Sequence, residues 1–178
     1  PVEEAAAEAA PAEGEEVEVP IHIEENNKVK AAVDYLREVI ARMGVENVTF
    51  SAVQKGEATI IRLDGEKLGA LIGRRGETLD AIQQLTGYAV NHGQSKRVRI
   101  HVDAEGYRSK REESLQRLAV KVAGKVVKYR KNMTLEPMNA YERHVIHTAL
   151  QDTPSVTTFS IGTEPNRRVV VSYDRTKA

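Results

Sequence analysis

The nine residues from 71 to 79 read Leu71-Ile72-Gly73-Arg74-Arg75-Gly76-Glu77-Thr78-Leu79. Two glycines three positions apart let the backbone turn sharply and leave its N–H groups uncovered by side chains. A helix is expected to begin near Glu77, and the positive end of that helix would face the same turn. Arg74 and Arg75 add two cations between the glycines. This stretch therefore has the chemistry to hold a phosphate backbone, although two glycines at this spacing often only end one helix and start another.

The residues around this loop predict a small α+β domain. Apolar residues recur at helical spacing before Gly44, and two short segments rich in β-branched residues flank the turn Lys55-Gly56-Glu57, which predicts a hairpin. A strand with alternating apolar and basic residues closes the region near Val102. The predicted elements are a helix, two strands, two helices and a strand, at residues 29–43, 47–53, 58–63, 67–72, 79–89 and 98–102.

This order of elements, with the glycine loop between the two later helices, resembles a type II KH domain over roughly residues 28–103. KH domains clamp four nucleotides of single-stranded RNA with a GXXG loop. The resemblance implies that Gly73, Arg74, Arg75 and Gly76 contact RNA, and that the bases lie in an adjacent groove against aliphatic side chains. Two rival phosphate-binding motifs, G-x-x-x-x-G-K-[ST] and G-x-G-x-x-G, are absent from the sequence.

The second half of the chain predicts another α+β domain, which begins with a long helix. Apolar residues from Leu115 to Val127 lie on one side of that helix, and a stripe of Lys and Arg that includes Lys121 and Lys125 lies on its surface. Such a stripe is either a solvated face or a contact for RNA backbone. The predicted elements are a long helix, a short strand, a helix and two strands, at residues 107–130, 133–136, 138–150, 156–161 and 167–174.

Arg143 and His147 are four residues apart on the second of these helices and are therefore neighbours on one face. A cation beside an imidazole makes a compact contact for a phosphate or a base. The spacing alone, however, is more often that of a polar pair at the edge of a helix. The same helix carries His144, but no carboxylate or third histidine stands at ligand spacing, so the sequence predicts no metal and no cofactor.

Arg-x-x-x-His after a basic helix and before a strand hairpin resembles an R-three-H domain, over roughly residues 115–174. That family binds single-stranded nucleic acid. KH followed by R-three-H is similar to the Jag (SpoIIIJ-associated) proteins of bacteria. Jag proteins usually begin with a small extra domain, and this sequence starts in what resembles the linker that follows it. Two segments of the sequence are similar to segments of that family: Leu135-Glu136-Pro137-Met138-Asn139 and Ile146-His147-Thr148-Ala149-Leu150-Gln151-Asp152.

Composition and charge fit a cytoplasmic protein that contacts a polyanion. The 178 residues contain no Cys, which excludes disulfides and thiolate metal sites, and no apolar run approaches a membrane span. The net charge of zero hides a division, because residues 1–25 hold nine Glu and no Lys or Arg. The remainder holds 26 basic against 17 acidic residues. Residues 1–25, rich in Ala, Glu and Pro, are predicted to be a disordered acidic linker.

The sequence thus predicts an α+β protein with a linker at 1–25, a type II KH domain at 26–104 and an R-three-H domain at 105–178. The resemblance implies a non-enzymatic regulator of transcripts that affect envelope growth, division or sporulation. Single-stranded RNA is the expected partner, with single-stranded DNA left open. A KH-only protein or a second copy is the further expected partner, with no small-molecule substrate and only an indirect link to membranes. A protein-interaction adaptor without strong RNA binding is the main alternative, and a nucleotide hydrolase is disfavoured by the missing P-loop.

Overall fold

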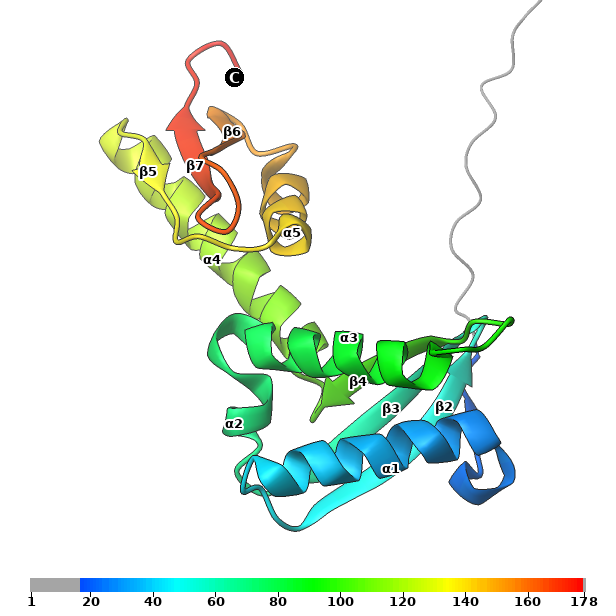
Figure 1. Cartoon of the computed structure of the whole chain (residues 1–178). Coiled ribbons are helices and arrows are strands. Elements are labelled where there is room, and N and C mark those ends of the chain that lie inside the picture. The colour runs from blue at the N-terminus through cyan, green and yellow to red at the C-terminus, as the bar shows by residue number, and fades with distance from the viewer. Residues whose placement is uncertain (1–16, 178) are drawn as a thin grey trace, which may run out of the picture. The chain divides into compact units, whose positions relative to one another are not determined.

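The computed structural model describes residues 17–177 of the chain (Figure 1). The fold is α+β, as predicted. The chain divides into two compact units. The first holds the residues up to Leu71 together with Thr78–Glu105, and the second holds Ile72–Glu77 together with the residues from Gly106 onward. The glycine loop therefore groups with the second unit, although the helices on either side of it belong mainly to the first.

The first unit is a four-stranded sheet with helices packed against it. The sheet has the order β1-β2-β3-β4, in which β3 and β4 are parallel and the other pairs are antiparallel. In Figure 1, α1 and α3 lie across the same face of this sheet. The elements are β1 (Val19–Ile21), α1 (Asn27–Arg42), β2 (Val48–Lys55), β3 (Ala58–Gly65), α2 (Gly69–Ile72), α3 (Glu77–Asn91) and β4 (Arg99–Ala104).

Helix α1 begins at Asn27, before the predicted first residue Val29, because the Asn26 side chain accepts hydrogen bonds from the backbone N–H groups of Lys28 and Val29. Its apolar stripe is buried against alternate residues of the sheet, including Ile61 and Leu63. A second polar side chain, Asn91, ends α3 and bonds both the N–H and the carbonyl of Val98, which fixes the entry into β4.

The prediction that residues 1–25 are disordered is wrong for its last part. Residues 19–21 form β1, which pairs with β2, and residues 23–25 form the short 3-10 helix η1 (Ile23–Glu25). The Glu18 carboxylate accepts two bonds of 2.7 Å from Arg62, which ties this segment to the sheet. An edge strand this short gains its stability from its partner strand rather than from its own composition. Residues 1–16 of the predicted linker lie outside the described residues.

The second unit is a three-stranded antiparallel sheet packed on two helices. Its sheet has the order β5-β7-β6, and its core combines Leu115 and Val126 of α4, Ile146 of α5, and Val169 and Val171 of β7. Among residues 17–177, no helix is both long and apolar enough to cross a membrane. The elements are the short 3-10 helix η2 (Arg74–Gly76), α4 (Tyr107–Tyr129), β5 (Met133–Thr134), α5 (Ala140–Leu150), β6 (Val156–Ile161) and β7 (Arg168–Tyr173).

Candidate nucleic-acid interface

The backbone of the glycine loop takes left-handed conformations at three of its four residues. The φ angle is 72° at Gly73, 57° at Arg75 and 79° at Gly76. A Cβ atom at position 76 would lie 2.7 Å from Cε1 of Tyr107, so the close approach of that ring also requires glycine. The sharp turn expected from the two glycines is present, and Tyr107 is a neighbour that the sequence did not predict.

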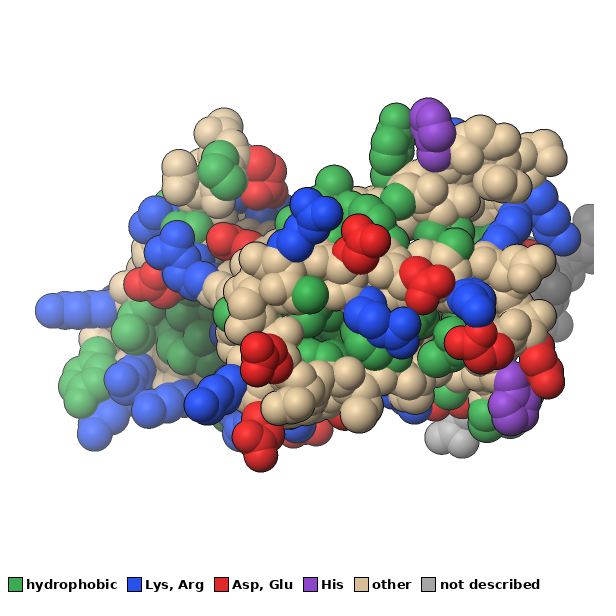
Figure 2. All heavy atoms as spheres, turned by 60° about the horizontal axis from the view of Figure 1, so that its bottom comes forward, with side chains coloured by type: hydrophobic (Ala, Val, Ile, Leu, Met, Phe, Trp, Pro, Cys, Tyr) green, Lys and Arg blue, Asp and Glu red, His purple; other side chains and the backbone are tan. Residues whose placement is uncertain are grey.

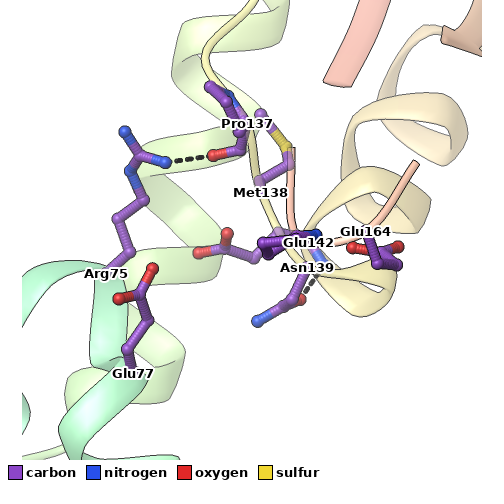
Figure 3. Close-up of a pocket in the computed structure, with 8 residues that line it drawn as sticks. Arg75, Glu77, Pro137, Met138, Asn139, Glu142 and Glu164 are labelled. Carbon is purple, nitrogen blue, oxygen red and sulfur yellow. Dashed lines mark hydrogen bonds between the residues drawn. The ribbon is translucent and has the colours of Figure 1, made fainter. Parts of the chain in front are cut away.

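The two arginines of the loop have different surroundings. Arg74 is exposed, and no ion pair to it is present among residues 17–177. Arg75 is held, because one of its guanidinium nitrogens donates to the Pro137 carbonyl and the other lies 2.9 Å from Glu136 Oε2. Figure 3 shows the Arg75 side chain extended toward Pro137. The Arg75 guanidinium is therefore already engaged within the second unit, and its contact with RNA stays a prediction.

A hollow of about 230 Å³ lies between the loop and the start of α5 (Figure 3). Three of the residues that line it, Glu77, Glu142 and Glu164, carry carboxylates. Two of these are already paired, Glu142 with Arg111 at 2.6 Å and Glu164 with Arg143 at 2.7 Å. Acidic walls repel phosphate, so the capacity of the loop to hold an anion rests on Arg74 and the loop backbone rather than on this hollow.

Arg143 connects the start of α5 to the turn between β6 and β7. Its side chain is buried, and its guanidinium donates to the Met138 carbonyl at 2.7 Å while pairing with Glu164 at the same distance. Asn139 caps the helix by accepting a bond of 2.9 Å from the Glu142 N–H. The Arg143 guanidinium of the Arg-x-x-x-His pair therefore already has its partners within the second unit.

His147 lies one turn further along α5 and bonds β6 instead. Its Nδ1 is 2.7 Å from the Thr158 hydroxyl and its Nε2 is 3.0 Å from the Ser160 hydroxyl. Burial lowers the pKa of His147, and the charges of His144 and Arg143 lower it further. The imidazole is therefore neutral at pH 7. Arg143 and His147 are neighbours, as predicted, but their hydrogen bonds go to different partners.

Next to His147 is a polar hollow of about 340 Å³. Its lining residues are His144, His147, Thr148, Leu150, Gln151, Thr157, Thr158 and Lys177. Neutral imidazole, hydroxyl and amide groups suit the donors and acceptors on the edge of a nucleobase. No motif in the sequence predicts this hollow, because Lys177 lies far along the chain from α5.

Lys121 and Lys125 are both exposed on α4, as a surface stripe requires. Residues 114–135 contain six Lys and Arg and no Asp or Glu. Figure 2 shows Lys and Arg side chains around a hydrophobic area at the left of that view, the side on which Figure 1 draws the end of α4. This part of the surface is rich in cations, and one of them, Arg117, is paired with Glu113 at 3.5 Å.

Comparison with known families supports both halves of this description. Residues 29–102 match the KH-domain model of KhpA and KhpB proteins, and residues 113–173 match the R-three-H domain model. The chain is 38% identical over 157 residues to the RNA-binding protein KhpB of Bacillus subtilis, which covers 86% of this chain and 74% of that protein. The chain belongs to the KhpB (Jag) family.

Other KhpB proteins align over the same two domains. The Clostridium symbiosum protein is 40% identical over 147 residues, or 81% of this chain and 65% of that protein. The Streptococcus pneumoniae D39 protein is 31% identical over 140 residues, or 79% of this chain and 42% of that protein. The chain thus spans between about two fifths and three quarters of the length of these relatives. The order KH then R-three-H, predicted from the motifs, is confirmed.

Proposed function

We propose that this chain binds single-stranded RNA through its GRRG loop, with Arg74 as the main phosphate contact. The observation that carries the proposal is the loop itself, in which Arg74 is exposed and unpaired within residues 17–177 while Gly73, Arg75 and Gly76 hold the backbone in a left-handed turn. Arg75 then acts as a positioning residue that anchors the loop through Glu136 and Pro137. The relatives named RNA-binding protein KhpB support the same ligand class.

The R-three-H domain supplies a second contact on the same strand. His147 and the polar hollow beside it offer neutral hydrogen-bonding groups for a base, while Lys121 and Lys125 offer charge for the backbone. Arg143 shapes this site by fixing α5 against the β6–β7 turn, since its guanidinium is engaged with Met138 and Glu164. Linking two weak sites raises affinity for strands long enough to span both.

The finer biological role is a proposal that family membership supports. The chain acts, in this proposal, as a non-enzymatic cytoplasmic regulator of transcripts that affect envelope growth, division or sporulation. It works alone, with a second copy or with a KH-only protein. Crosslinking in cells followed by sequencing of the bound RNA tests this role directly, and transcripts without any link to these processes would contradict it.

The test of the loop compares two single variants with a matched control. Arg74→Ala is expected to weaken binding to a single-stranded RNA roughly 5- to 10-fold and to reduce the salt dependence by about the 0.7 unit of one phosphate contact. Arg42→Ala removes the same charge from an exposed position on α1, where the side chain is 84% exposed, and is expected to leave affinity nearly unchanged. If both variants lose the same RNA affinity, the effect of Arg74 comes from the net charge of the protein and not from a specific phosphate contact.

Arg75 provides the observation that favours the alternative, a protein-interaction adaptor. Its pairing with Glu136 removes one of the two cations that the loop could offer to RNA. If the unmodified chain binds no RNA, the adaptor becomes the better account. Unchanged RNA binding in both Arg74→Ala and Arg74→Glu would instead contradict the loop contact and leave RNA binding to another surface. The two readings thus differ in one affinity measurement on a folded protein.

A further inference from the structure

The sheet of the second unit has an outward face that the proposed function does not use. Side chains alternate along a strand, and in β6 Thr158 and Ser160 point to His147 on α5. Phe159 and Ile161 therefore point to the other face, where they are 46% and 42% exposed. The register pairs Phe159 with Val170, which lies outside the core cluster that contains Val169 and Val171.

Polar and cationic groups surround Phe159 on this outward face. Arg168 is paired with Ile161 at one end. Its guanidinium donates to the Asn166 carbonyl at 3.5 Å and has no ion pair within residues 17–177. Thr157 is paired with Ser172 at the other end, where the Ser172 hydroxyl donates to the Asn132 side chain at 2.8 Å. Side chains diagonally opposite in such a sheet lie about 7–8 Å apart, within reach of a base and its neighbouring phosphate.

The charge around this face is complementary to nucleic acid. None of the residues in β5, β6 and β7 is Asp or Glu. The segment that leads into β5 carries Lys128, Arg130 and Lys131. Across the turn that joins β6 to β7, the one carboxylate is that of Glu164, which is paired with Arg143. A phosphate beside Phe159 would therefore meet cations and no free carboxylate of this sheet.

We infer that this outward face is a stacking platform on which an unpaired RNA base lies against Phe159 while an adjacent phosphate meets Arg168. Aromatic rings receive bases of any identity, because every base has a π-face. A protein partner fits less well, since two exposed large hydrophobic side chains are few for the apolar centre of an interface. The inference rests on the proposed function and adds a contact that is distinct from the GRRG loop and from His147.

Fluorine NMR can observe the platform directly, because the chain contains two Phe residues. Full chain labelled with fluorophenylalanine gives one resonance from Phe159 and one from Phe50, a β2 residue with the Arg37 guanidinium 5.5 Å from its ring centroid. The spectrum of Phe159→Leu lacks the Phe159 resonance and so assigns both resonances. The Phe50 resonance reports that the first unit is folded. On addition of a 12-nucleotide oligouridine, we expect the Phe159 resonance to shift in step with RNA binding. Binding without a shift of that resonance would overturn the platform.

Affinity measurements with the same oligouridine distinguish a stacked ring from an apolar patch. Phe159→Leu keeps the apolar side chain, and Phe159→Tyr keeps the ring. We expect Phe159→Leu to weaken binding about 5- to 100-fold, as for loss of one stacked base, and Phe159→Tyr to remain near the unmodified value. Circular dichroism confirms that both variants are folded. Wild-type affinity in Phe159→Leu overturns the platform alone, whereas absence of RNA binding in the unmodified chain overturns the proposed function with it.

Discussion

Arg74 and Arg75 have the same side chain and adjacent positions, and the left-handed backbone at Arg75 sends them to different surroundings. Arg74 points to solvent, whereas Arg75 reaches a carbonyl and a carboxylate more than 60 residues further along the chain. An exposed ion pair contributes only about 0–1 kcal/mol, so the Glu136 contact orients the loop more than it stabilises the fold. The sequence shows two cations between two glycines, but it cannot show which of them is already occupied.

Gly76 is the loop residue at which a single methyl group should have the largest effect. Gly76→Ala adds the strain of a left-handed φ of +79°, about 1–2 kcal/mol, and also places a Cβ 2.7 Å from the Tyr107 ring. Gly44→Ala is the matched control, because its φ is +76° and nothing lies within 4 Å of the added atom. We expect the unfolding temperature to fall further in Gly76→Ala than in Gly44→Ala. Equal losses would mean that the Tyr107 ring moves aside without cost.

The helices and strands were largely predictable, because their signals are local. Apolar periodicity, the Asn26 cap and the Gly44 stop define α1 within the sequence of the helix itself. The contacts that define the site are not local. His147 takes its partners from β6, Gly76 packs on Tyr107, and Arg75 bonds a loop in the other half of the chain. The Arg-x-x-x-His spacing could therefore place two residues on one face, but it could not show that Arg143 is buried against Glu164.

Strand β1 shows the same limit, and it leads to a test by truncation. Three residues in an acidic segment carry no strand signal, yet they pair with β2, and Glu18 bonds Arg62. Removing residues 1–25 is therefore expected to lower the thermal stability of the chain relative to removing residues 1–16 only. The comparison isolates β1, η1 and the Glu18 bond. Identical unfolding temperatures for the two truncated chains would show that this edge strand contributes nothing to stability.

Helix α5 and strand β6 should give the second unit a pH-dependent stability through His147. Its pKa is lowered in the fold by burial and by His144 and Arg143, so the unfolded chain binds its proton more readily. The contribution is fully present above the unfolded pKa of about 6.5 and is lost as the pH falls through 6.5 toward the lower folded pKa. We expect the unfolding temperature to fall more between pH 7.5 and 5.5 in the unmodified chain than in His147→Gln. The other four histidines are present in both proteins, so the same fall in both would contradict this assignment.

Across the whole molecule, the division of charge should act on RNA affinity at long range. Residues 1–16 contain six Glu and no Lys or Arg, so the rest of the chain carries a net charge of +6 when they are removed. A carboxylate influences a phosphate mainly within the Debye length, which is about 30 Å at 0.01 M salt and about 8 Å at 0.15 M. The effect of these residues on RNA binding should therefore depend strongly on ionic strength.

Deleting residues 1–16 is expected to strengthen binding to a single-stranded RNA at low salt, and the gain should shrink as salt rises toward 0.15 M. The deletion leaves β1 and its pairing with β2 in place, so a gain would not come from a change in the first sheet. Changing the six Glu to Gln in the full chain is the matched control, because it removes the same charge at constant length. RNA affinity is measured at three salt concentrations for the deletion and for the Gln chain, which distinguishes an effect of charge from an effect of the segment's bulk. A gain from deletion but not from the Gln chain would point to steric exclusion, and a loss in both would show that these carboxylates assist binding.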